Sequence, residues 1–204
     1  MGVYINNNLK WTEHIKHVNN KIAKNIGILR KLRYFAPLRL LKQLYHSFVY
    51  PYFTYGIMSW GNCYKSAIEN IRTKQNSAIK TIFFAHRRES PKSYYNLLEV
   101  LNLDNIFKLR IVSFTYQIIQ KKEEIIPAPF KNLIKPAKNV HSYNTRFSAN
   151  LNFQRPKART NYGIHSFKFA ASQIWQDIPL NIKTLKTMHE FQNHLKKHLL
   201  MLQY

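Results

Sequence analysis

The carboxylates of this chain are too few and too scattered to hold a pair of catalytic metal ions. Polymerases and nucleases that use two divalent cations need several Asp or Glu side chains close together. Only two aspartates occur, Asp104 and Asp177, and they are far apart in the sequence. Glu123 and Glu124 are adjacent but follow two lysines, where we expect solvated charges. We therefore predict no catalytic residue.

Two histidine pairs have the spacing of metal ligands on one helix face. His14 and His17 are three residues apart and His194 and His198 are four apart, so each pair can meet on one side of a helix. A zinc site needs three or four ligands, and we find no third or fourth partner for either pair. We predict no metal site and no cofactor in this chain.

Cys63 is the single cysteine, which excludes an internal disulfide and a cysteine-based zinc site. A thiol becomes a nucleophile when a histidine such as His46 lies close to it. A lone cysteine is more commonly a small buried side chain, and we expect this for Cys63. The five glycines are too widely separated to form a phosphate-binding loop.

Positive charge is the strongest chemical feature. The 204 residues contain 32 Lys and Arg against nine Asp and Glu, a formal net charge of +23. A single lysine usually only solvates a helix face, but self-repulsion of this size is relieved by a polyanion. We expect RNA, DNA or an RNA–DNA hybrid, bound through its phosphates without sequence choice. The two sets of cations expected to bind are Lys16, Lys24, Arg30, Lys31, Arg33, Arg39 and Lys42, and Lys131, Arg146, Arg155, Lys157 and Arg159.

The stretch from residue 125 to residue 176 contains eight Lys and Arg and no acid. Four prolines interrupt it, and aromatic residues such as Tyr143, Phe147 and Phe167 lie among the cations. Such rings can stack on unpaired bases, but packing inside the domain is the more common role for each of them. Phosphate binding by the cations is expected in either case.

Helical spacing of apolar residues predicts the elements that carry these cations. From Trp11, a basic helix buries Ile15, Val18, Ile22, Ile26 and Leu29. Gly27 inside this helix suggests close packing against another element.

The next segment, 37–61, is predicted to be the central element of the core. Its apolar stripe consists of Leu38, Leu41, Tyr45, Phe48 and Tyr52. Pro37 suits a first helical turn, whereas Pro51 is expected to divide the segment into helices 37–50 and 51–59. Residues 43–64 carry no formal charge, but their polar side chains and Pro51 favour a buried core over a membrane span.

A third helix is predicted from the capping box Ser66–Glu69. Its buried positions are Ile71, Gln75, Ala78, Ile79 and Ile82. Asp104 is expected to cap a later helix. Thr187 and Glu190 are expected to form the capping box of the last helix. The buried positions expected in this last helix are Met188, Phe191, Leu195, Leu199 and Leu202. Short strands are predicted at 3–5 and within 162–169.

The fold class is therefore mainly α, a three-helix bundle followed by further helices and a looser basic tail with minor short strands. The expected divisions are an edge-strand remnant at 1–10, the bundle at 11–86, connecting helices at 87–124 and a basic C-terminal region at 125–204.

In order along the chain, several motifs resemble the C-terminal part of jockey-like non-LTR retrotransposon reverse transcriptases. These are Gly2-Val3-Tyr4-Ile5, Trp11-Thr12-Glu13-His14-Ile15, Pro51-Tyr52-Phe53-Thr54-Tyr55-Gly56, Trp60-Gly61, Thr145-Arg146, Asn161-Tyr162-Gly163 and Trp175-Gln176-Asp177-Ile178-Pro179. Asn6 and Gln176 depart from residues that are frequent in that family.

The resemblance implies a palm-edge remnant followed by a thumb at 11–84, which holds the primer–template backbone, and a tail that contacts the element's RNA or target DNA. The family's palm aspartates have no counterpart in this chain, so Mg²⁺ is expected only for the missing palm, and polymerase activity is assigned to no residue here. The missing palm and fingers segment is a further expected partner. Three alternatives stay open: a helical scaffold for an acidic protein, a mis-split gene for a working polymerase, and a decayed copy without a function.

Overall fold

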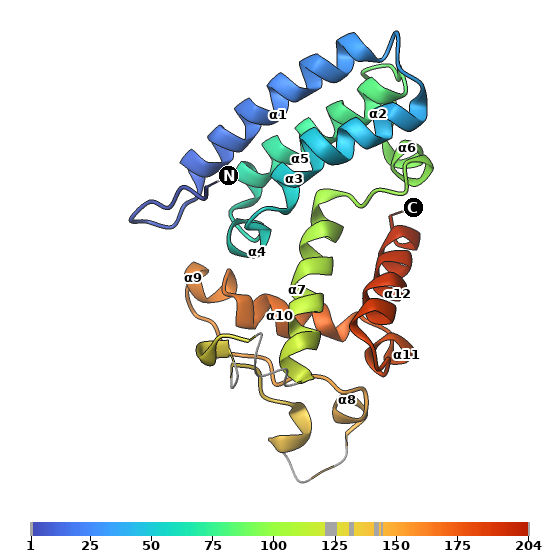
Figure 1. The fold of residues 1–204 in the computed structure, drawn as a ribbon. Helices are drawn as coiled ribbons and strands as arrows, with labels where there is room; N and C mark the ends of the chain where they lie inside the picture. Colours follow the sequence, from blue (N-terminus) through green and yellow to red (C-terminus); the bar gives the residue numbers. More distant parts are fainter. Residues whose placement is uncertain (1, 121–125, 131–132, 141–142, 144, 204) are drawn as a thin grey trace. The chain divides into compact units, whose positions relative to one another are not determined.

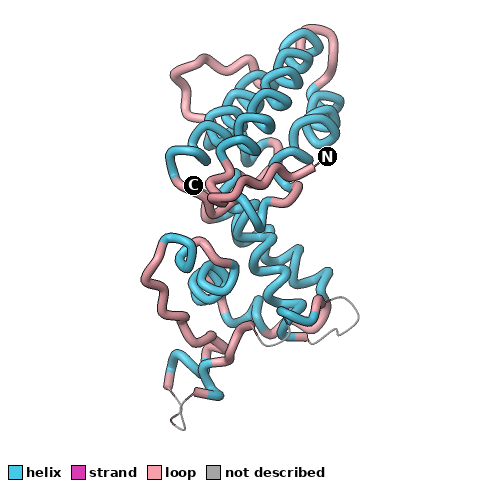
Figure 2. The backbone as a smooth tube through the Cα atoms, turned by 90° about the vertical axis from the view of Figure 1, so that its left-hand side faces the viewer, coloured by secondary structure: helices cyan, strands magenta, loops and turns pink. Residues whose placement is uncertain are grey.

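A computed structural model describes residues 2–120, 126–130, 133–140, 143 and 145–203. The chain is mainly α, as predicted, and the described residues contain helices and loops but no strand beyond an isolated bridge between Pro136 and Phe153 (Figures 1 and 2). Two compact units are present. Unit 1 comprises Met1–Phe107 with Leu200–Tyr204, and unit 2 comprises Lys108–Leu199.

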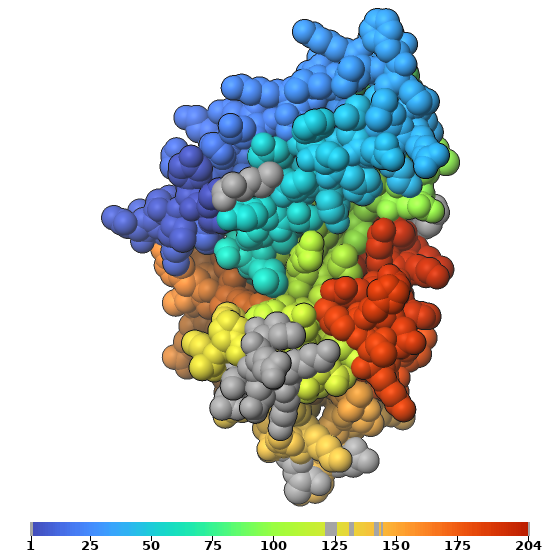
Figure 3. All heavy atoms as spheres, in the orientation of Figure 1, coloured from blue at the N-terminus to red at the C-terminus, as the bar shows by residue number. Residues whose placement is uncertain are grey.

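Unit 1 is built on two long helices, α1 and α5, and on a rod made of three consecutive short helices. In chain order its elements are α1 (Thr12–Leu32), α2 (Leu38–Leu44), the π-helical η1 (Tyr45–Val49), α3 (Tyr50–Thr54), α4 (Ile57–Trp60), α5 (Lys65–Ile82), α6 (Lys92–Leu97) and the start of α7 (Leu103–Ile119). α1 packs against α5, and the rod formed by α2, η1 and α3 packs on α1 (Figure 1). In the space-filling view, α1, α2 and α3 form one continuous face (Figure 3).

α1 follows its predicted pattern. All five apolar positions expected to point inward are buried, and His14 is buried with them. The expectation for Gly27 is wrong, because no atom of another element lies within 4 Å of the point where its Cβ would be. The amphipathic pattern determines this helix without any need for close approach at the glycine.

Pro51 does not break the composite rod, contrary to the prediction. The backbone bonds widen to the π pattern over η1, where the Tyr50 N–H bonds to the Tyr45 carbonyl, and the helix continues through Pro51 to Thr54. The side chain of Asn25, on α1, donates to the Phe48 carbonyl and so gives a partner to a backbone acceptor of this irregular turn. The helical rod ends at Tyr55, whose backbone is extended.

The buried face of the rod also differs from the predicted stripe. Leu41 and Tyr45 are buried as expected, but Leu38 and Phe48 are nearly half exposed. The buried side chains of the rod are spaced by four residues: Leu41, Tyr45, Val49 and Phe53. Ile57 and Trp60, in α4, are also buried. A π turn contains more residues than an α turn, so it keeps every fourth residue on one side.

The predicted core face of α5 is confirmed, but its predicted cap is not. Ile71, Gln75 and the later expected positions are buried. The helix begins one residue before Ser66, with Tyr64 at the N-cap and no side-chain cap bond. Glu69 instead bonds to Arg72. This pair lies within α5, three residues apart, and Arg72 also contacts Asp104 of α7, so Glu69 is held by Arg72 and not by the expected cap.

Two further caps have different outcomes. Asp104 lies in the first turn of α7, but it is Asn102 whose side chain accepts from the backbone N–H of Asn105. At α12 (Met188–Met201), Thr187 accepts from the backbone N–H of Glu190 at 3.3 Å, as predicted. The Glu190 carboxylate accepts from the Thr187 hydroxyl. Phe191, Leu195 and Leu199 are buried in this last helix, whereas Met188 is half-buried and Leu202 is exposed.

Unit 2 surrounds a small aromatic core. Besides parts of α7 and α12, its elements are η2 (Ala128–Phe130), η3 (Ala137–Asn139), α8 (Arg146–Ala149), α9 (Asn161–Ile164), α10 (Phe167–Gln176) and α11 (Leu180–Lys183). Tyr116 stacks on Phe191 with 4.0 Å between ring centroids, and Trp175 lies 6.1 Å from Phe191. The Trp175 indole N–H donates to the Leu151 carbonyl at 3.0 Å.

Both predicted strands are absent. Residues 3–5 form no strand, because a lone extended segment has no neighbour with which to pair. Residues 162–164 belong to α9 and residues 167–169 to α10, and the side chains of Thr160 and Ser166 cap these helices. Each of these caps accepts a backbone N–H three residues later, a local interaction that favours helix over the aromatic alternation.

Candidate nucleic-acid interface

The C-terminal halves of α1 and α5 enclose a positively charged groove, which we call the basic groove. Its volume is about 630 Å³. The side chains that line it are Arg30, Arg33, Thr73, Lys74, Asn76, Ser77, Lys80, Thr81, Ala85 and Arg87. Five of these ten residues are cations, none is Asp or Glu, and the remainder are mostly hydroxyl or amide side chains. Such a lining suits an anionic ligand that carries several acceptor oxygens.

α1 and α5 position these groups because each helix buries its apolar face against the other. On α5, Gln75, Ala78 and Ile79 point into the core, which places Lys74 and Lys80 on the polar side. The two lysines are six positions apart in the sequence, which corresponds to about 9 Å along the helix at ~1.5 Å per residue. This length corresponds to two or three nucleotide steps at ~3.4 Å each.

Several groove side chains are held by contacts within unit 1. The Lys80 ammonium donates to the Arg87 carbonyl at 2.7 Å, which fixes the loop after α5 beside the helix. The Arg33 guanidinium donates to the Thr81 carbonyl at 3.4 Å and to the Tyr34 hydroxyl at 3.0 Å. These bonds leave donors on Lys80 and Arg33 available to a ligand.

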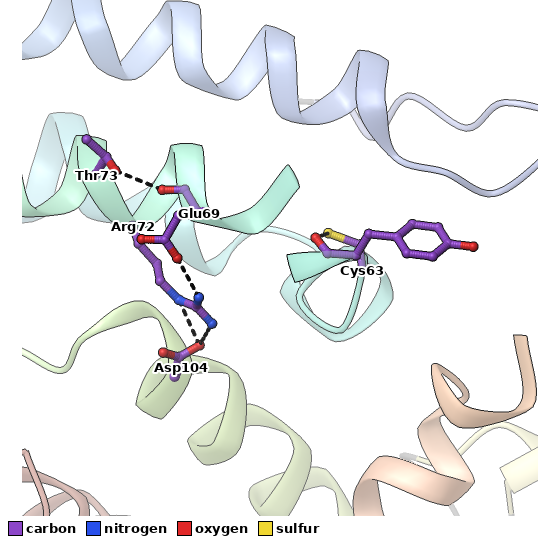
Figure 4. Close-up of polar contacts among 6 residues, drawn as sticks. Cys63, Glu69, Arg72, Thr73 and Asp104 are labelled. Carbon is purple, nitrogen blue, oxygen red and sulfur yellow. Dashed lines mark hydrogen bonds and ion pairs between the residues drawn. The ribbon is translucent and has the colours of Figure 1, made fainter. Parts of the chain in front are cut away.

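The described acids of unit 1 that form ion pairs do so outside the groove. Arg72 contacts Glu69 at 2.7 Å and Asp104 at 2.6 Å (Figure 4), and Lys42 contacts Glu99 at 3.2 Å. Within the described part of the chain, no ion pair includes a cation of the basic groove. The groove cations are therefore not neutralised by any ion pair among the described residues.

Glu89 is an acid that interacts electrostatically with a groove cation, Lys80. Its carboxylate accepts from the Tyr94 hydroxyl at 2.6 Å and from the backbone N–H of His86 at 2.9 Å. The bond from Tyr94, followed by that from His86, lowers the pKa of Glu89 below its ordinary value, and nearby Lys80 adds to this effect. The side chain of Glu89 does not line the groove.

The first set of predicted cations is only partly brought together. Arg30 and Arg33 line the basic groove. Lys42 is paired with Glu99, which satisfies its charge within the protein. The other four members are exposed on α1 or α2 and do not line the groove: Lys16, Lys24, Lys31 and Arg39.

The second set belongs to unit 2, and Lys131 lies outside the described residues. Arg146, Lys157 and Arg159 are exposed. Arg155 lines a separate hollow of about 460 Å³ together with Tyr143 and Phe147, and its guanidinium donates to the Gln176 side chain at 2.6 Å.

Some aromatic side chains of the 125–176 stretch are packed inside unit 2, and others are exposed. Phe167 packs against Phe114 and Phe130 with centroid distances of 5.4 and 5.8 Å, and Phe153 is buried beside Trp175. Tyr143 is largely exposed. The packing role expected for Phe167 is therefore confirmed, whereas the ring of Tyr143 faces outward.

Sequence reasoning missed three members of the groove as candidate binding residues: Lys74, Lys80 and Arg87. The signal was present in α5, where residues 73, 74, 76, 77, 80 and 81 are all polar and follow helical spacing. That pattern marks a wide polar face, but only the packing of α5 against α1 places Arg30 and Arg33 opposite it.

The other candidate chemical groups are held in ways that do not form a reactive centre. Burial raises the pKa of the Cys63 thiol to about 11, so the thiol is protonated and a poor nucleophile near neutral pH. Burial, and then the charge of neighbouring His17, lowers the pKa of His14. Within the described ranges, no group of three or more His, Cys, Asp or Glu side chains is arranged to hold a metal ion.

No described helix has the length and apolar character required to cross a membrane. Comparisons with known proteins return no match to a family model, to a curated protein or to a solved structure.

Proposed function

We propose that this chain is a nucleic-acid-binding module that corresponds to the thumb and tail of a non-LTR retrotransposon reverse transcriptase. In this proposal it holds a primer–template or the element's RNA through phosphate contacts, while the carboxylates that bind Mg²⁺ and synthesise DNA belong to the palm. The ordered set of sequence motifs supports the family, and the helical bundle of unit 1 is compatible with a thumb.

The observation that carries the binding proposal is the convergence of five cations on one groove without an acidic side chain in its lining. Such a convergence is costly unless an anion occupies it, because like charges repel and are only partly screened by salt. Three phosphates of one strand, spaced along the ~9 Å between Lys74 and Lys80, match the length of the groove face of α5.

A binding titration tests this proposal with a fluorescently labelled RNA–DNA hybrid in dilute buffer. The variant R30Q/K74Q/R87Q removes three groove charges, and the control variant K10Q/K21Q/K65Q removes three exposed charges that do not line the groove. We expect the groove variant to lose roughly tenfold or more in affinity and the control variant to lose only a few-fold, because non-contacting charges act at long range and are screened.

Two results would contradict the proposal. Equal losses in the two variants would mean that binding reflects net charge rather than the groove. Strong binding to an acidic protein or to heparin, without binding to the hybrid, would favour the alternative of a helical scaffold for an acidic protein.

A further inference from the structure

Exposed aromatic residues follow the two helices that form the basic groove. Tyr34 is 65% exposed, Phe35 is 88% exposed and Phe84 is 52% exposed. Tyr34 and Phe84 are in edge-to-face contact, with 5.4 Å between their centroids, although they come from loops that follow different helices. We call Tyr34 and Phe84 the aromatic platform.

Arg33 joins the aromatic platform to the basic groove. This residue lines the groove, and its guanidinium carbon lies 4.3 Å from the centroid of Phe84 and 5.0 Å from that of Tyr34. The next residue after Phe84, Ala85, is also part of the groove lining. A strand with its phosphates in the groove therefore has aromatic faces within reach of its bases.

The backbone of Phe84 gives an independent reason to assign a role to its ring. Phe84 has a φ of 56°, in the left-handed region, at the position just past the C-cap of α5. The following N–H, of Ala85, bonds to the Lys80 carbonyl at 3.0 Å, which is the closing bond of a Schellman motif. Glycine or asparagine is preferred here, and a bulky residue is disfavoured. A half-exposed ring held in a disfavoured backbone conformation favours a role for Phe84 beyond its contacts with Tyr34 and Arg33.

We propose that the aromatic platform stacks on unpaired bases, so that the ligand of the basic groove is a single-stranded segment or a strand end rather than a continuous duplex. This inference rests on the proposed function, since the groove supplies the phosphate contacts. Bases inside a duplex are stacked on one another and cannot present a face to Phe84, whereas unpaired bases can. The adjacent cations favour a polyanion over an apolar protein surface as the occupant of the platform.

The decisive variant is Phe84→Asn, which removes the ring and places a residue that tolerates positive φ at the helix end. We expect F84N to keep or raise the melting temperature while it lowers the affinity for a single-stranded 12-mer roughly tenfold or more. A 2-aminopurine base within that 12-mer should lose fluorescence on binding to the wild-type protein and much less on binding to F84N. Tyr64→Asn, at the N-cap of α5, is the matched aromatic control; it should change neither the affinity for the 12-mer nor the 2-aminopurine fluorescence, although Asn at an N-cap should raise the melting temperature.

An abasic sugar-phosphate strand with the same number of phosphates separates the two proposals. We expect its affinity to fall in K74Q and to stay unchanged in F84N. If no strand binds the wild-type protein, the proposed function fails, and the platform fails with it. If K74Q weakens binding to the 12-mer but F84N changes neither affinity nor fluorescence, only the platform is refuted. A lower melting temperature for F84N, or an equal loss of affinity for duplex and single strand, would also refute it.

Discussion

Replacement of Gln75 by leucine should destabilise unit 1 strongly, although leucine is apolar and fits the space. The Gln75 amide is buried, with 1% of the residue exposed, and donates to the Leu101 carbonyl at 3.0 Å and to the Tyr45 hydroxyl at 3.3 Å. These bonds connect α5 to the rod and to the segment before α7. In Q75L both acceptors remain buried without this partner.

The magnitude follows from the two groups that lose their donor. Each buried polar group left without a partner costs about 1–3 kcal/mol, and the added apolar surface of leucine returns part of this sum. We expect a net loss of roughly 3 kcal/mol. Burial, as the largest cause, raises the pKa of Tyr45 well above its ordinary value, so the hydroxyl stays protonated in the variant and still needs a partner.

Chemical denaturation of a double-mutant cycle provides the assay. Tyr45→Phe alone should cost only about 1 kcal/mol, because Gln75 keeps its bond to the Leu101 carbonyl. Q75L/Y45F should be at least as stable as Q75L, since the unpartnered hydroxyl is gone. If the two single losses simply add in the double variant, or if Q75L is as stable as the wild type, the reasoning about this buried network is wrong.

Three further predictions follow from the described contacts. Gly61→Ala should lower the free energy of unfolding by about 1–3 kcal/mol, because a Cβ at residue 61 would lie 2.6 Å from the Ile57 carbonyl oxygen and 2.6 Å from the Phe107 ring. Gly27→Ala should raise it by about 0.5–1 kcal/mol, because nothing lies within 4 Å of the added Cβ. Thermal melts of both variants measure the two effects. Burial lowers the pKa of Lys183 to about 8 against an ordinary value of 10.5, so the unfolded state binds more protons than the folded state between these pH values. The free energy of unfolding, relative to that of K183M, should therefore rise by roughly 3 kcal/mol from pH 8 to 10.5. A difference that does not change with pH would contradict the assignment. For three phosphates in the groove, affinity for the single-stranded 12-mer should fall roughly 20-fold between 50 and 200 mM salt through this site, and the salt slope should decrease by about two in R30Q/K74Q/R87Q.

The sequence by itself determined the helical class and the faces of the long helices. α1 and the core side of α5 were predicted residue by residue, because a helix must bury its apolar stripe, and that stripe is set by local periodicity. The net charge of +23 likewise follows from composition alone. The buried face of each long helix depends only on near neighbours in the chain.

Only the tertiary structure decided the features that depend on distant residues. The π turn before Pro51 is accompanied by a bond from Asn25 on another helix, so local rules predicted a break where none occurs. The cap expected at Ser66 is absent, and Arg72, which pairs with Glu69, also contacts Asp104, 32 residues further along the chain. The basic groove exists because the packing of α1 against α5 brings together cations more than forty residues apart in the chain. Helical periodicity gives the direction of each side chain on its own helix, but the partner across a groove is set by how the helices pack.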